Sequence, residues 1–180
     1  MVSTEVLAIL ISGLGITTSI LYYTLTLRNQ NRSRETQWVS QLLENKINEE
    51  SMESFMDVMS ANWTDIDDFL EKYDNTVNSR HAAIRNAKWS FYDMLGGFVK
   101  DRRLDVDLVY QFYNMRCLLM WFKYETVIKY YRLGTLDRDY MENFEYLADR
   151  MVEIRQRKGL NLPLSLLHPT STLQGKYINR

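Results

Sequence analysis

Cysteine, proline and glycine are scarce in this chain of 180 residues. Cys117 is the only cysteine, which excludes a disulfide within the chain and a zinc or redox site of the C-x-x-C kind. No proline precedes Pro163, and neither glycine nor proline occurs between Gly15 and Gly96. Because sheet proteins need turn residues about every ten positions, so long a stretch without them predicts long helices and an all-α fold.

A strong charge of one sign is also lacking. The 22 Lys and Arg residues nearly balance the 23 Asp and Glu residues, so no overall field would attract nucleic acid, and we expect no nucleic-acid partner. The two histidines, His81 and His168, lie far apart and outside spacings such as H-E-x-x-H. The pattern predicts no catalytic residue, no cofactor and no metal site.

One long uncharged run is present, from Val6 to Leu27. A helix of this length spans about 33 Å, which matches a bilayer hydrocarbon core of about 30 Å. A cleaved signal peptide would need a positively charged start and a shorter apolar segment, whereas residues 1–5 contain no Lys or Arg. We therefore predict an uncleaved single-pass transmembrane helix within residues 1–27, with a buried helix of a soluble protein as the alternative.

Two glycines in this run, Gly13 and Gly15, could begin a phosphate-binding loop. The dinucleotide fingerprint needs a third glycine and a strand before it, and both are missing. A stripe of small residues fits better, because such stripes allow two membrane helices to approach closely. It consists of Ala8, Ser12, Gly15 and Ser19. The spacing also fits small residues that are merely tolerated, and the sequence leaves both interpretations open.

The residues at the end of the run predict an orientation. Tyr22 and Tyr23 stand where aromatic rings favour the boundary between lipid and water. Arg28, Arg32 and Arg34 follow the run, and no Lys or Arg precedes it. By the positive-inside rule we expect a cell-membrane protein with its N-terminus outside and its C-terminal domain in the cytoplasm. The lipid bilayer is then its first partner.

The rest of the chain predicts a helical stalk and a compact domain. Residues 28–48 continue the helix as a juxtamembrane stalk, residues 49–159 form the cytoplasmic bundle of four to five helices, and residues 160–180 form an extended, partly flexible tail. Helices are expected near residues 50–60, 65–73, 79–99, 105–131 and 137–158. Four aromatic residues are candidates to line a small-molecule pocket: Trp89, Tyr92, Tyr113 and Trp121.

Four segments within residues 11–151 resemble a known family: "LYYTLTLRNQNRSRE", "YDMLGGFVKDRRLDVDLVYQF", "WFKYETVIKYYR" and "MENFEYLADRM". The family is an uncharacterised prokaryotic one, a membrane-anchored domain of unknown function. The resemblance implies a membrane anchor and carries over no activity, cofactor or catalytic residue.

The leading functional interpretation is a membrane-anchored interaction or scaffold module, or an accessory subunit of a membrane complex. It rests on an anchor joined to aromatic-rich helices without a catalytic motif, and it predicts a protein partner or self-association. The alternative is a membrane-tethered enzyme or small-molecule sensor that uses the aromatic pocket. A third interpretation is a soluble component whose first helix is buried in a partner.

Overall fold

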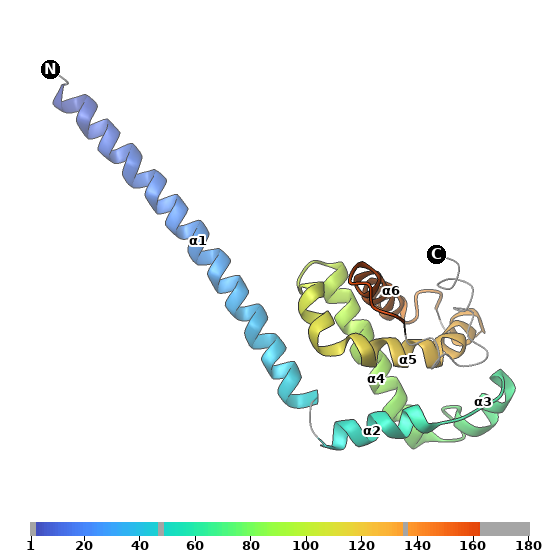
Figure 1. Ribbon diagram of the computed structural model, residues 1–180. Coiled ribbons are helices and arrows are strands. Elements are labelled where there is room, and N and C mark those ends of the chain that lie inside the picture. The colour runs from blue at the N-terminus through green and yellow to red at the C-terminus, as the bar shows by residue number, and fades with distance from the viewer. Residues whose placement is uncertain (1–2, 47–48, 135–136, 163–180) are drawn as a thin grey trace. The chain divides into compact units, whose positions relative to one another are not determined.

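The computed structural model describes residues 3–46, 49–134 and 137–162 and, within them, six α-helices and no strand (Figure 1). The predicted all-α fold is confirmed. The helices are α1 (Thr4–Lys46), α2 (Glu49–Ser60), α3 (Ile66–Tyr73), α4 (Ser79–Lys100), α5 (Val106–Gly134) and α6 (Glu142–Arg157). The chain divides into two compact units, Met1–Asn48 and Glu49–Arg180.

The first unit contains the single helix α1, which is 43 residues long. It runs without a break because no proline occurs in it and its glycines are confined to Gly13 and Gly15. Among the side chains that the structure describes, no helix offers an apolar stretch long enough to cross a membrane. The predicted transmembrane helix is therefore not supported by the described residues, and the side chains of its first part, residues 5–11, are not among those described.

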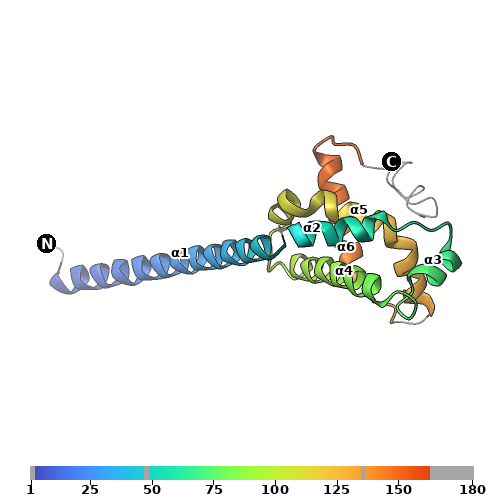
Figure 2. The same cartoon turned by 90° about the horizontal axis from the view of Figure 1, so that it is seen from below.

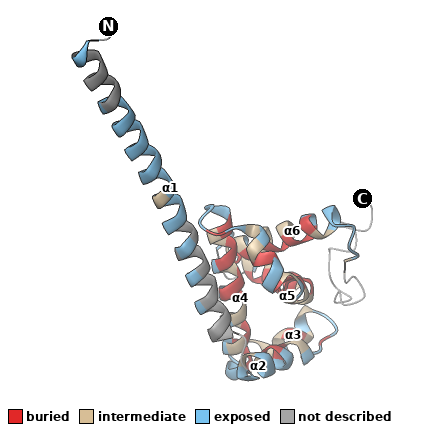
Figure 3. Ribbon diagram, turned by 60° about the vertical axis from the view of Figure 1, so that its left-hand side comes forward, coloured by how far each residue is buried: buried red, intermediate tan, exposed pale blue. Residues whose placement is uncertain are grey.

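The second unit is built around α4, α5 and α6. Figure 3 shows that buried residues concentrate on these helices. The apolar run at residues 117–122 lies in α5, where Leu118, Met120 and Trp121 are buried, as expected for a core helix. In Figure 2, α2 lies beside α4, and the Lys88 ammonium of α4 donates to the Ser51 carbonyl of α2 at 3.0 Å.

The helices α4 and α6 cross closely at Gly96. A Cβ atom placed on Gly96 would lie 1.9 Å from the backbone oxygen of Asn143, so only glycine fits at this crossing. One turn earlier in α4, the Asp93 carboxylate accepts the backbone N–H of Phe144 at 3.0 Å and caps the start of α6. The ring of Tyr92 stacks on Phe144 with 5.2 Å between centroids. Two of the segments that resemble the family, "YDMLGG" and "MENF", therefore dock on each other.

Candidate functional site

The described part of the apolar run in α1 is exposed on all sides. Three leucines share one side of the helix at i, i+7 and i+11, and three further apolar residues occupy the opposite side. These residues are Leu14, Leu21 and Leu25, and Ile16, Ile20 and Leu27, and their exposed fractions range from 42% to 68%. A helix that is apolar on opposite sides, rather than along one stripe, is typical of a helix surrounded by apolar material.

The hydroxyl groups of this run are satisfied by the helix itself. Four of them donate to the carbonyl oxygen four residues earlier, each at 2.8 Å: Thr17, Thr18, Ser19 and Thr24. Burying a hydroxyl group without a hydrogen-bond partner costs a few kcal/mol, roughly 1–3 by protein mutational data. Because these hydroxyls already have acceptors, they do not depend on water, and apolar surroundings would penalise them less.

The small residues predicted to pack membrane helices lie on this exposed surface. Ser12, Gly15 and Ser19 are exposed, and a Cβ atom on Gly15 would meet no atom within 4 Å. The side chain of Ala8 is not among those that the structure describes. The stripe is therefore open along its described part, and its role in association stays a prediction.

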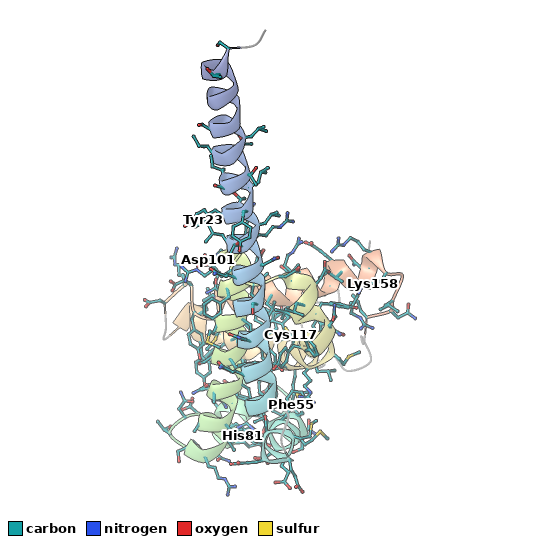
Figure 4. The ribbon with its side chains drawn as sticks, turned by 90° about the vertical axis from the view of Figure 1, so that its left-hand side faces the viewer. Tyr23, Phe55, His81, Asp101, Cys117 and Lys158 are labelled. Atoms are coloured by element: carbon teal, nitrogen blue, oxygen red, sulfur yellow. The ribbon has the colours of Figure 1, made fainter. Side chains whose placement is uncertain are left out.

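The residues predicted to set the orientation follow the run in the same helix. Tyr22 and Tyr23 are exposed, and Figure 4 shows the Tyr23 side chain projecting from α1. Arg28 is exposed as well. Arg32 and Arg34 lie outside the residues whose side chains are described. The predicted interfacial roles of these residues are not tested by their placement.

The four aromatic residues proposed for a pocket are all buried, and they fall into two clusters. Tyr92 and Trp121 both contact the ring of Phe144, and Phe91 connects Tyr92 to Tyr113. Trp89 instead packs edge-on against Tyr124, with 5.3 Å between centroids. The structure thus brings together three of the four predicted residues and places Trp89 in a separate cluster.

The cluster around Trp89 contains a buried cation, Arg85. Its guanidinium is fully buried and lies 5.0 Å from the ring centroids of both Phe69 and Trp89. Nη1 donates to the Tyr73 carbonyl at 2.8 Å, and Nη2 donates to Asn75 Oδ1 at 2.9 Å. The Tyr73 carbonyl belongs to the last turn of α3, so Arg85 also lies at the negative end of that helix's dipole.

Arg85 was not predicted as a site residue, although its spacing from Trp89 in the sequence indicated that its side chain would be buried. His81, Arg85 and Trp89 recur every four residues and therefore share one stripe of α4. Trp89 marks this stripe as a core face, so a histidine and an arginine on it are expected to be buried. All three side chains contain buried nitrogen atoms without a hydrogen-bond partner: both ring nitrogens of His81, Nε of Arg85 and Nε1 of Trp89.

The surroundings of His81, labelled in Figure 4, favour the neutral form of its imidazole. Burial, and secondly the positive charge of Arg85, lower the pKa of this imidazole below its ordinary value. Tyr73 of α3 stacks on the ring with 4.7 Å between centroids, Asp57 of α2 opposes the lowering, and Lys123 of α5 adds to it. Protonating His81 in the folded state would place an imidazolium beside these cations.

This arrangement predicts a loss of stability in mild acid. Below about pH 6.5 the unfolded chain binds a proton at residue 81 that the folded chain does not, so the free energy of unfolding falls as the pH falls. One such histidine accounts for at most about 1.4 kcal/mol per pH unit. We expect urea midpoints to fall between pH 7.5 and pH 5, and His81→Leu to reduce this fall while His168→Ala does not. An identical fall in His81→Leu would contradict this account.

The comparisons with known proteins add one match. The family model described as a domain of unknown function (DUF4760) matches residues 6–151, which include α1 to α5 and most of α6. No curated protein and no solved structure matches the chain. The matched range contains all four quoted segments that resemble such a family, and it includes the Gly96 crossing and the Arg85 cluster. This chain therefore belongs to the DUF4760 family of domains of unknown function.

Proposed function

We propose that α1 anchors this protein in the cell membrane and that the unit from α2 to α6 acts in the cytoplasm as an interaction or scaffold module. The observation that supports the anchor most strongly is the apolar run of α1, exposed on opposite sides, with its hydroxyl groups bonded to its own backbone. A helix of this kind is stable where apolar material surrounds it, and a bilayer supplies such material along about 20 residues.

The interaction role is supported by the surface of the second unit. Large apolar side chains are exposed on three of its helices, and two pairs of them stand out: Met52 and Met56 on α2, and Phe112 and Met115 on α5. In each pair the residues are three or four positions apart, so they share a helix face. Methionine is flexible and polarizable, which suits adaptable protein contacts. These faces are candidates for contact with the cytoplasmic part of a membrane complex.

The proposed orientation can be tested with single cysteines. Cys117 is fully buried, and burial raises the pKa of its thiol, so the native thiol reacts poorly. An added cysteine at an exposed position, Ser3→Cys or Arg80→Cys, then reports its own side of the membrane. In intact cells we expect a membrane-impermeant maleimide to label Ser3→Cys at once and Arg80→Cys only after detergent is added. The reverse pattern would overturn the orientation.

A further inference from the structure

The buried stripe of α4 lacks hydrogen-bond acceptors at two fully buried donors. Arg85 Nε and Trp89 Nε1 are both enclosed, and neither has a partner. The two residues stand on consecutive turns of one helix face, and the guanidinium carbon lies 5.0 Å from the centroid of the indole ring. A buried N–H group without an acceptor is destabilising. Two such groups on consecutive turns of one helix face favour an acceptor bound near them.

The same place also lacks negative charge. Both acceptors of Arg85, the Tyr73 carbonyl and the Asn75 side-chain oxygen, are neutral, and no ion pair of Arg85 occurs among the described residues. Lys123 adds a second cation to this aromatic cluster, with its ammonium 5.0 Å from the centroid of Trp63. A buried charge without a counter-charge costs several kcal/mol. Arg85 therefore lacks both a hydrogen-bond acceptor at Nε and a counter-charge for its guanidinium.

One acid near the end of α3, Asp74, is already engaged. Asp74 Oδ1 accepts the hydroxyl of Tyr131 at 2.8 Å, and Oδ2 accepts the hydroxyl of Thr76 at 2.9 Å. Its negative charge raises the pKa of Arg85, but by less than burial lowers it. The carboxylate thus stabilises the turn after α3 and does not serve as the direct partner of Arg85.

We propose that this cluster binds a small monovalent anion of about halide size, which accepts hydrogen bonds from Arg85 Nε and Trp89 Nε1. A water molecule could accept the same two bonds but would leave the guanidinium charge uncompensated. The anion must be small because both donors are fully buried and the guanidinium lies against the rings of Phe69 and Trp89. The site goes beyond the proposed interaction role and would make folding of the cytoplasmic unit dependent on the anion.

The test is the anion dependence of thermal unfolding of the full chain in detergent. Sodium chloride or sodium bromide is compared with sodium gluconate, whose anion is too large for an enclosed site, at constant ionic strength. An anion bound only by the folded state stabilises it by mass action. We expect the unfolding temperature to rise by about 5 °C between 1 and 300 mM chloride, and the rise to follow the logarithm of the chloride concentration once the site is mostly occupied. Equal unfolding temperatures in chloride and gluconate, which water at the site would produce, would overturn the proposal.

Variants separate the site from general salt effects. Trp89→Phe keeps a buried ring and removes the Nε1 donor, so we expect it to lose most of the chloride-specific rise. Arg85→Met should abolish the rise altogether. Arg103→Gln is the matched control, because Arg103 is an exposed arginine of the same unit, and it should keep the full rise. If Arg85→Met does not fold, Trp89→Phe still tests the proposal. An unchanged chloride-specific rise in the unfolding temperature of Trp89→Phe would overturn it. Membrane association, which depends on α1, should be the same in all variants.

Discussion

Replacing Gly96 by alanine is expected to destabilise the second unit by roughly 3 kcal/mol or more, at the upper end of what overpacking costs. The added methyl group would lie 1.9 Å from the Asn143 oxygen and 2.5 Å from the Asn143 carbonyl carbon. Both atoms belong to the backbone and cannot rotate away as the end of a side chain can. The crossing of α4 and α6 would have to widen, which would also weaken the Asp93 cap on α6 and the stacking of Tyr92 on Phe144.

The neighbouring glycine provides the control for this experiment. A Cβ atom on Gly97 would meet only the side chain of Asn143, at 3.6 Å or more, which is an ordinary contact. Because alanine favours a helix over glycine by about 0.5–1 kcal/mol, Gly97→Ala should be neutral or slightly stabilising. Urea unfolding of the two variants measures the difference directly. Equal stabilities would show that the helices are farther apart at Gly96 than the structure places them.

Two arginines in the middle of the α1 run, Ile16→Arg with Ile20→Arg, are expected to release the protein from membranes. On a biological insertion scale each arginine at a helix centre costs about 2.5–3.5 kcal/mol, so the pair costs about 6 kcal/mol. Both positions lie near the middle of the run from Val6 to Leu27, so rotation of the helix about its axis would not bring either charge nearer to the headgroups. Wild-type protein should stay in the pellet after an alkaline carbonate wash, and the variant should appear in the supernatant.

The same two charges outside the run make the matched control. Asn29→Arg with Gln30→Arg adds them next to Arg28, where the positive-inside rule tolerates or favours them, and this variant should stay in the pellet. Retention of the Ile16 and Ile20 variant in the pellet would argue that α1 is held by a protein partner. Release of the control variant would show that added charge alone disturbs membrane association.

Most helix positions could be predicted from the sequence, because they depend on local signals. The lack of glycine and proline predicted long helices, and the expected ranges 50–60, 65–73 and 79–99 lie within a residue of α2, α3 and α4. The last helix was expected from residue 137, but α6 begins at Glu142. Residues 138–141 form turns instead, and the cap of α6 comes from Asp93 on another helix. Because this cap comes from a residue far away in the sequence, the residues around the start of α6 do not reveal it.

The candidate site was less predictable, for a related reason. Helical spacing places Arg85 on the same stripe of α4 as Trp89, but it does not show which groups surround the guanidinium. Its burial depends on the end of α3, which supplies the Tyr73 carbonyl, and on Asn75 in the following turn. The four aromatic residues were expected to line one pocket, whereas they are divided between two clusters, and this division depends on how α3 and α6 pack on opposite parts of α4 and α5. Helical spacing identifies the face that is buried but does not identify its neighbours.

The most direct test of the membrane anchor is photolabelling from within the bilayer. A hydrophobic photoactivatable probe is dissolved in native membranes that contain the full chain, and the labelled protein is digested with trypsin and mapped by mass spectrometry. No lysine or arginine precedes Arg28, so one tryptic peptide, residues 1–28, carries the whole predicted anchor. The account predicts label on this peptide and none on peptides from α2 to α6. An unlabelled residue 1–28 peptide, with other membrane proteins labelled in the same sample, would contradict it.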